Sequence, residues 1–383
     1  MSRDASYTTS LRKNRVLYAD KVIQEQTFQN NLKNHITRQG VPQGKKSSNY
    51  DFYYTATAGA IATTANEQTQ YIENVFGIPR PTILISVLSG NEQLTVYFRQ
   101  SQPVITDIMY SIDGGSSYNS AATNVSPFVI RGLTNITTYN IVVKAVNTLG
   151  VGDASNSMYG IPLPGTGLML FLDGGSVTDT SSTVWNDKSM QANNAVLYNS
   201  PRYDSSVGGF YAFDGTNQYA QVPSGFANFS SGLTILAFVN FGTSNNWERI
   251  IDFGNGTQSN NIIFGRNSGT NNLVFEIYNG VNQTRSFRGT YTNAITNSTW
   301  GFFAARIDGT ACKLWKNTTS TSSSTTVLPD NITRTQNYIG RSNWPDDSYF
   351  NGYMGVVSVY NSPLDDTDVT AFFDTFKGRY GIS

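Results

Sequence analysis

The stretch that decides the fold of the C-terminal half lies at residues 339–364 and reads IGRSNWPDDSYFNGYMGVVSVYNSPL. In it a tryptophan, a proline and two adjacent aspartates come immediately before a run whose side chains alternate in polarity. Such alternation is typical of a strand with one buried face. The stretch therefore predicts a polar loop that leads directly into a buried strand.

The rest of the chain has the composition of a mainly β protein. Charged residues make up only 14% of the sequence, while Gly, Ser, Thr, Asn and Tyr are abundant. Many short strands joined by polar turns have this composition, whereas helical bundles do not. A chain of 383 residues is long enough for two or three domains, each with its own core. We therefore expect several β domains in series.

From residue 165 to residue 383 the pattern is one of longer alternating strands, separated by loops of Asn, Gly and Ser. About a dozen such strands fit one double-sheet jelly roll. This segment resembles a laminin-G-like, concanavalin A-like domain, and the motifs that carry the resemblance are WND (185–187), NN (193–194), FDG (213–215), IGR (339–341), FNG (350–352) and VYNSPL (359–364). Its end, FFDTFKGRYGI at 372–382, is similar to the ends of such domains in virion proteins of tailed phages and large DNA viruses. The resemblance implies a concanavalin A-like jelly-roll β-sandwich over 165–383.

Residues 80–163 predict a smaller β domain. About seven short strands fit into this segment, which is the size and strand number of an immunoglobulin-like sandwich. The segment resembles a fibronectin type III module through the motifs YSIDGG (110–115), RGLTNITTY (131–139), VKAVNTLGVGDAS (143–155) and GIP (160–162). The resemblance implies an immunoglobulin-like β-sandwich that acts as a spacer.

The first 79 residues differ from both β segments. Apolar residues near a common face predict a helix over 10–38. The first 48 residues carry nine Lys or Arg against three acids, so a tail of +6 precedes a body of −6. Such asymmetry suggests that the two ends face different partners. We interpret 1–79 as a helical and extended attachment region that docks through basic residues: Arg12, Lys13, Arg15, Lys21 and Lys33.

The residues offer little for catalysis. Glycoside hydrolysis needs two carboxyl groups spaced across the scissile bond. Residues 165–383 hold only two glutamates, Glu248 and Glu276, on different predicted strands. The single His35 lies in the expected helix, and the single Cys312 alternates within a predicted strand as a packed side chain would. We therefore expect no enzyme.

Two tryptophans stand apart as candidate binding residues. Trp344 and Trp247 lie at junctions of loop and strand beside polar residues. An exposed ring can stack on the C–H face of a sugar, while neighbouring amides, carboxylates and guanidinium groups bond its hydroxyls. The alternative is that each ring caps the end of the sandwich. The candidate glycan-binding residues are Trp344, Asn343, Asp346, Asp347, Tyr349, Arg341 and Trp247.

The same loop also offers a candidate metal site. Calcium requires only oxygen ligands, and Asp346 and Asp347 are the best candidates for binding it. No repeated Asp-x-Asp pattern accompanies them, and no other cofactor is expected.

We expect a non-enzymatic virion surface protein, either capsid-associated or a fibre. The start of the chain has no signal-peptide pattern, and no apolar run is long enough to span a membrane, which fits a virion part made in the host cytoplasm. The expected partners are other virion or capsid proteins, through 1–79, and host-surface glycans, with homo-oligomers an open question and no nucleic acid. A purely architectural capsid or fibre subunit, and a microbial cell-surface adhesin, stay open as alternatives.

Overall fold

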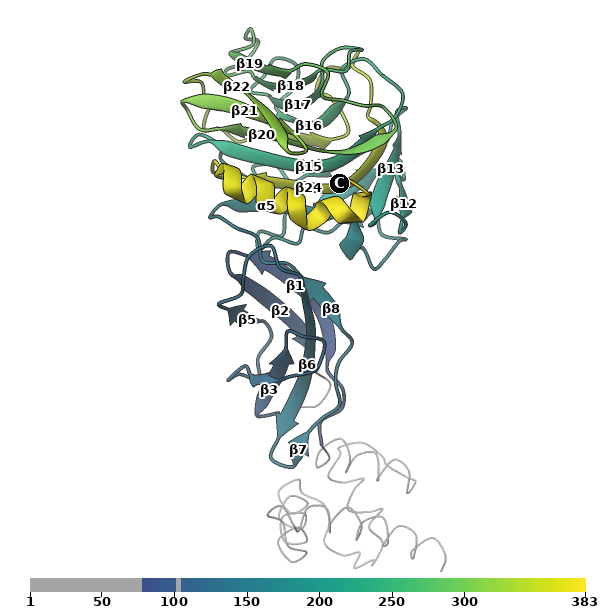
Figure 1. Cartoon of the computed structure of the whole chain (residues 1–383), viewed down its shortest axis with the longest axis vertical. Coiled ribbons are helices and arrows are strands. Elements are labelled where there is room, and N and C mark those ends of the chain that lie inside the picture. The colour runs from purple at the N-terminus through teal and green to yellow at the C-terminus, as the bar shows by residue number, and fades with distance from the viewer. Residues whose placement is uncertain (1–77, 101–104) are drawn as a thin grey trace, which may run out of the picture. The chain divides into compact units, whose positions relative to one another are not determined.

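The computed structural model describes residues 78–100 and 105–383 (Figure 1). The helix expected at 10–38 and the five basic residues expected to dock the chain lie outside these described residues. The described part is mainly β, as the composition predicts. None of its helices is long and apolar enough to cross a membrane.

The chain divides into two compact units. The first takes in the described residues up to Ser86 together with Val96–Phe128 and Tyr139–Met158, and the second takes in Val87–Thr95, Val129–Thr138 and Tyr159–Ser383. This division passes through the segment 80–163. The boundaries expected from the sequence, at 1–79, 80–163 and 165–383, therefore stay predictions.

Eight strands between residues 83 and 160 form two small sheets. The three-stranded sheet has the order β1 (Ile83–Gly90), β2 (Gln93–Arg99) and β5 (Phe128–Arg131). The five-stranded sheet has the order β4 (Asn119–Ser120), β3 (Asp107–Ser111), β6 (Tyr139–Asn147) and β7 (Gly150–Val151), with β8 (Met158–Gly160) also paired to β6. Phe128 packs on Phe98 of β2 and on Tyr110 of β3, with ring centroids 6.0 and 5.8 Å away. Apolar packing thus joins these strands, while the fibronectin type III resemblance stays a prediction.

Sixteen strands between residues 168 and 360 form two large antiparallel sheets. The β16 sheet has the order β10 (Val184–Trp185), β11 (Ala195–Tyr198), β14 (Tyr219–Val222), β23 (Gln336–Ile339), β16 (Arg249–Gly254), β17 (Ile262–Arg266), β18 (Leu273–Ile277) and β19 (Phe287–Tyr291). The β15 sheet has the order β12 (Arg202–Asp204), β13 (Phe210–Asp214), β24 (Asn351–Tyr360), β15 (Leu233–Phe241), β20 (Thr299–Ile307), β21 (Ala311–Lys316) and β22 (Thr319–Ser324), with β9 (Leu168–Asp173) paired to β24. Many strands that are neighbours in these sheets are far apart in the sequence, and the two sheets form a jelly-roll-like, concanavalin A-like β-sandwich.

The main core of the jelly roll is built from alternate side chains of these strands. In β16, Ile251 and Phe253 are fully buried in this core. Because successive side chains of a strand point to opposite faces, Asp252 between them lies on the outer face of the β16 sheet. The same alternation places Ala220 of β14 and Ile339 of β23 in the core and Tyr219 and Tyr338 on the outer face, where Tyr219 is partly exposed and Tyr338 is buried.

A helix covers the outer face of the other sheet. Helix α5 (Asp366–Phe376) was not predicted from the sequence, and Asp365 is its N-cap residue. The carboxylate of Asp365 accepts a hydrogen bond from the backbone N–H of Asp368 at 2.7 Å. The helix runs alongside β15 and β24 (Figure 1). The rings of Phe372 and Phe373 pack on Phe238 of β15, with centroids 6.4 and 6.3 Å away. The helix and the β15 sheet thus share a second apolar core.

We expect Phe373→Ala to lower the free energy of unfolding by about 3–5 kcal/mol, because it leaves a cavity between α5 and the β15 sheet. Urea unfolding followed by tryptophan fluorescence measures the change. Val281→Ala, at an exposed position, is the control and should change it by less than about 0.5 kcal/mol. Equal effects for the two variants would show that α5 adds no packing energy.

Candidate functional site

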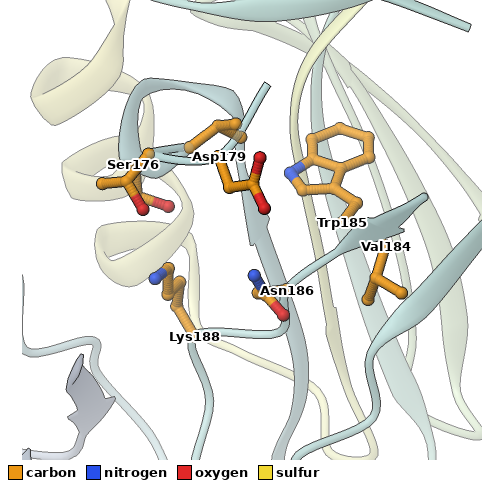
Figure 2. A pocket seen from close by; sticks show the side chains of 8 residues that line it. Ser176, Asp179, Val184, Trp185, Asn186 and Lys188 are labelled. Carbon is orange, nitrogen blue, oxygen red and sulfur yellow. The ribbon is translucent and has the colours of Figure 1, made fainter. Parts of the chain in front are cut away.

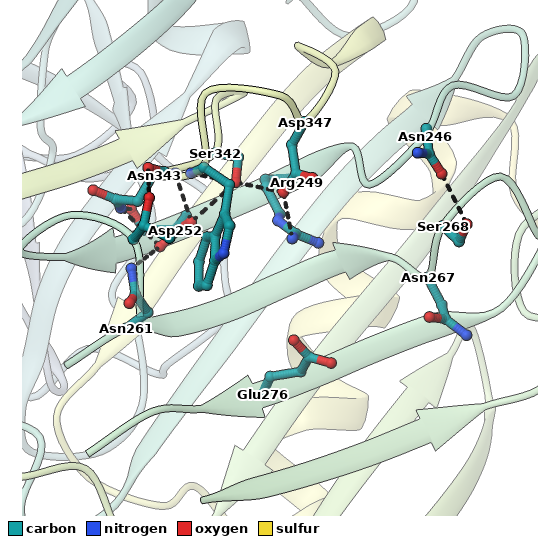
Figure 3. Close-up of polar contacts among 12 residues, drawn as sticks. Asn246, Arg249, Asp252, Asn261, Asn267, Ser268, Glu276, Ser342, Asn343 and Asp347 are labelled. Carbon is teal, nitrogen blue, oxygen red and sulfur yellow. Dashed lines mark hydrogen bonds and ion pairs between the residues drawn. The ribbon is translucent and has the colours of Figure 1, made fainter. Parts of the chain in front are cut away.

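The loop at 341–349 connects β23 to β24 and carries most of the candidate binding residues. It lies against the outer face of the β16 sheet, where Asp252 anchors it (Figure 3). The carboxylate of Asp252 accepts hydrogen bonds at 2.8 Å from both the backbone and the side-chain N–H of Asn343, and at 3.0 Å from the amide of Asn261. Asp252 is fully buried, and this burial raises its pKa, although the charge of Arg249 acts in the opposite direction. The loop is therefore held down by a buried carboxylate that it also shields from water.

A second anchor lies further along the same loop. Asp347 forms an ion pair of 2.8 Å with Arg249, whose side chain is only 4% exposed, and accepts a hydrogen bond of 2.7 Å from the Ser342 hydroxyl (Figure 3). Burial raises the pKa of Asp347 as well. A folded-state pKa above the usual value means that the charged form is disfavoured by folding. The contribution of Asp347 to stability therefore increases as the pH falls through that pKa, so this carboxylate does not drive acid unfolding.

Trp344 lies between these two anchors and is partly buried. Its ring packs against Tyr278, which follows β18, with 5.3 Å between the ring centroids. Pro345 and Asp346 beside it are exposed. Trp344 thus caps the outer face of the sheet and also presents part of its ring to solvent, so both interpretations of this residue stay open.

Trp247 lies near two arginine side chains. The guanidinium groups of Arg249 and Arg288 are 5.4 and 5.5 Å from its ring centroid. Arg288, together with Arg285, is paired with the buried carboxylate of Glu276. The face of Trp247 is therefore already in contact with cations.

Three tyrosines surround Arg341 at the start of the loop, and a fourth stacks on one of them. The guanidinium carbon of Arg341 is 4.5 Å from the ring centroid of Tyr338, 4.8 Å from that of Tyr219 and 5.9 Å from that of Tyr349. Tyr198 of β11 stacks on Tyr219 of β14, with centroids 4.7 Å apart and planes only 2° from parallel. We call Tyr198, Tyr219, Tyr338, Tyr349 and Arg341 the tyrosine cluster. Tyr198 is 39% exposed, so this cluster presents aromatic surface to solvent.

The sequence analysis identified only Arg341 and Tyr349 of this cluster. Tyr198, Tyr219 and Tyr338 come from three neighbouring strands, and strand pairing places Tyr198 opposite Tyr219. Each tyrosine follows or precedes a buried apolar residue. That alternation was the available signal, because a tyrosine at an outward position of a strand is a candidate for a surface role.

The structure brings most of the predicted site residues to one face, but in different roles. Asn343 and Asp347 are engaged in anchoring the loop, whereas Trp344, Arg341 and Tyr349 are partly exposed and Asp346 is exposed. Among residues 78–100 and 105–383, no group of three or more His, Cys, Asp or Glu side chains is placed to share a metal ion. Calcium binding by Asp346 and Asp347 therefore stays a prediction.

A small pocket elsewhere on the jelly roll is lined by residues that include Asp179, Trp185 and Lys188 (Figure 2). Its volume is about 10 Å³, which is roughly the space for one water molecule. The Trp185 indole N–H is buried there and has no hydrogen-bond partner in the described structure. The pocket is too small to take a sugar ring.

The two glutamate carboxyl groups and the cysteine thiol, which the sequence analysis considered for catalysis, are engaged in structural contacts. Glu248 forms a 2.6 Å ion pair with Arg266, and both side chains are fully buried. Glu276 accepts a hydrogen bond of 3.1 Å from Arg285 and a further one from Arg288. Cys312 is packed in the core, as the sequence predicts, and its burial raises the pKa of the thiol to about 12.

We expect Asp252→Asn to destabilise the fold by about 1–3 kcal/mol, because an amide places donors where Asn343 and Asn261 also donate. Hydrogen exchange at the backbone N–H of Asn343 should become faster than in the unmodified chain. Asp346→Asn changes an exposed carboxyl of the same loop and should leave both the melting temperature and the exchange rate unchanged. Unaltered exchange in Asp252→Asn would contradict the anchoring role.

Several solved structures have a limited similarity to this chain. No curated protein matches the sequence. Similar solved structures include domain 4 of AbnA, a GH43 extracellular arabinanase from Geobacillus stearothermophilus, in complex with arabinotriose; it shares 14% identity over 54% of this chain and 98% of that chain, with a TM-score of 0.40. The binding domain of botulinum neurotoxin DC in complex with SialylT shares 13% identity over 55% of this chain and 52% of that chain, with a TM-score of 0.43. The Ruminococcus gnavus IT-sialidase CBM40 bound to alpha2,3 sialyllactose shares 15% identity over 40% of this chain and 94% of that chain, with a TM-score of 0.33. These likenesses carry no conclusion about what this chain binds.

A family model matches part of the jelly roll. Residues 214–370 match the model Laminin_G_3, described as the concanavalin A-like lectin/glucanases superfamily. The match covers a large part of the segment whose motifs resemble such a domain, including the loop at 341–349 and the start of α5. Residues 214–370, which make up less than half of the chain, are therefore similar to the concanavalin A-like lectin/glucanases superfamily.

Proposed function

We propose that the jelly roll is a non-enzymatic glycan-binding domain whose binding surface is formed by the tyrosine cluster and the exposed part of Trp344. One observation carries this proposal: partly exposed aromatic rings and a guanidinium group gather at the two ends of one anchored loop, on the outer face of the β16 sheet. The opposite sheet has no comparable free face over β15, because α5 covers it.

The chemistry of this surface suits a sugar. An aromatic ring offers its face to the C–H side of a pyranose, while hydroxyl, amide and guanidinium groups bond the ring hydroxyls. Here the stacked Tyr198 and Tyr219 provide the ring faces, and Arg341 provides donors beside them. Because Asp252 and Arg249 hold the loop in place, little conformational entropy is lost when a ligand binds.

The superfamily includes glucanases as well as lectins, so hydrolysis is the competing function for this fold. Two features favour binding over hydrolysis. The two glutamates of the jelly roll are buried in separate ion pairs with arginines. Neither glutamate side chain is exposed to a substrate, since they are 0% and 3% exposed, whereas hydrolysis needs two carboxyl groups that face one scissile bond.

We further propose that this domain is displayed on a virion surface, with the basic region at 1–79 docking to other virion or capsid proteins and the jelly roll contacting host-surface glycans. The support is the resemblance of the sequence at 372–382 to virion proteins and the charge asymmetry of +6 against −6. An architectural capsid or fibre subunit would use the same surface to contact a neighbouring subunit, and a cell-surface adhesin would use it on a microbial cell.

We expect the full chain to bind a subset of a glycan array, and Tyr198→Ala to weaken that binding about tenfold, which corresponds to about 1.4 kcal/mol. Trp344→Ala should weaken it by a similar factor, because it removes the second aromatic surface. The control is Tyr159→Ala, which removes an even more exposed tyrosine from β8 and should have no effect.

Two outcomes of the array would contradict the proposal. If the folded chain binds no glycan, then glycan recognition is wrong and the architectural subunit is favoured. If binding persists at full strength in both Tyr198→Ala and Trp344→Ala, then the sugar is held elsewhere on the molecule.

A further inference from the structure

Arg341 differs from the other arginines of the jelly roll in the way its charge is satisfied. Of the nine arginines between residues 165 and 383, seven form ion pairs with carboxylates, namely Arg202, Arg249, Arg266, Arg285, Arg288, Arg306 and Arg379. An eighth, Arg334, is buried and donates to the backbone carbonyl groups of Asn260 and Asp330. Within the described residues, Arg341 has no Asp or Glu at ion-pair distance and is held by tyrosine ring faces instead.

We propose that Arg341 is the specificity-determining residue of the glycan site and selects sugars that carry a carboxylate. This inference rests on the proposed glycan-binding function. The guanidinium of arginine is planar, and its N–H groups match the two oxygens of a carboxylate. Ring faces attract a cation through their quadrupoles but do not neutralise it, so the charge of Arg341 is available to an anionic ligand.

The surroundings of Arg341 strengthen such an interaction. Tyr219, Tyr338 and Tyr349 exclude water from its sides, and an ion pair formed in a partly desolvated place is stronger than one in open solvent. Arg341 and Tyr349 are both partly exposed, so a ligand can reach the cluster. Tyr198, stacked beside Tyr219, extends the aromatic surface away from the charge and would contact the ring that bears the carboxylate.

Cation–π contacts alone could have a structural purpose, namely to attach the start of the loop to β14 and β23. That role predicts a loss of stability when Arg341 is changed but no selectivity among ligands. A recognition role predicts selectivity that depends on the planar guanidinium group. The two are therefore separated by comparing ligands rather than by comparing melting temperatures.

The experiment measures the affinity of the full chain for oligosaccharides in matched pairs. Each pair consists of a uronate-containing oligosaccharide and its carboxyl-reduced counterpart, which has the same linkages and length. A third arm uses sulfated oligosaccharides of the same backbone, because a sulfate could also occupy the site. We expect the unmodified chain to bind the carboxylated member of a pair about tenfold more tightly than the reduced member, and the preference to shrink as salt is raised.

Variants assign this preference to Arg341. In Arg341→Gln the ratio between the affinities for the two members of a pair should fall to about one, because the guanidinium group that pairs with the carboxylate is absent. Arg341→Lys keeps the charge but loses the planar fork, so it should retain only part of the preference. The matched control is Arg202→Gln, since the Arg202 side chain is 67% exposed and lies on β12 of the other sheet.

Each outcome bears on a different claim. An unchanged ratio in Arg341→Gln, or equal binding of both sugars by the unmodified chain, would overturn the role of Arg341 and leave glycan binding intact. A preference for the sulfated arm over the carboxylated arm would overturn the carboxylate assignment. Binding of neither member of any pair by a chain that binds other glycans of the array would overturn this inference alone, whereas binding of no glycan at all would overturn the proposed function as well. If Arg341→Gln does not fold, Arg341→Lys still tests the loss of preference.

Discussion

The buried carboxylate of Asp252 is the interaction on which the candidate site depends. A charged group without water must be satisfied by hydrogen bonds, since its desolvation is otherwise costly. Asn261 supplies one of these bonds from the adjoining segment, and Asn343 supplies two from the loop at 341–349. The carboxylate of Asp252 therefore depends on the loop at 341–349 for two of its hydrogen bonds. Through the loop, Asp252 also determines where Arg341 and Tyr349 lie.

The outer faces of the two sheets of the jelly roll are covered in different ways. The outer face of the β15 sheet is apolar and is covered by an amphipathic helix with phenylalanines on its buried side. The middle of the outer face of the β16 sheet is polar and is covered by the loop through hydrogen bonds and an ion pair. A polar cover specifies the positions of its side chains more narrowly than an apolar one, because hydrogen bonds are directional. The polar face is thus the better scaffold for recognition.

Much of the fold could be predicted because it follows from local alternation. The run at 350–360 alternates, and it forms the central strand β24. Of the three tryptophans that the family resemblance places in core strands, Trp185 and Trp315 are buried, whereas Trp300 is only partly buried. Helix α5 was missed although its buried residues have helical spacing, because the segment follows a strand with only a short polar connection and its eleven residues read as a continuation of the β pattern. The resemblance of residues 80–163 to a fibronectin type III module stays a prediction, since sheet order alone does not identify such a module.

The sequence by itself determined that the protein is mainly β, that its C-terminal segment is concanavalin A-like, and that the polar residues of one loop are candidates for binding. Only the tertiary structure decided which of these polar groups are free. Asn343 and Asp347 resemble ligand-binding residues in the sequence, yet they bond to Asp252 and Arg249, which lie about ninety to one hundred residues earlier in the chain. Tyr219 and Tyr338 meet at Arg341, and Tyr198 stacks on Tyr219, only because β11, β14 and β23 are neighbours in the sheet. The physical reason is that alternation is a property of each strand alone, whereas partners across a sheet are set by strand order, which local sequence does not encode.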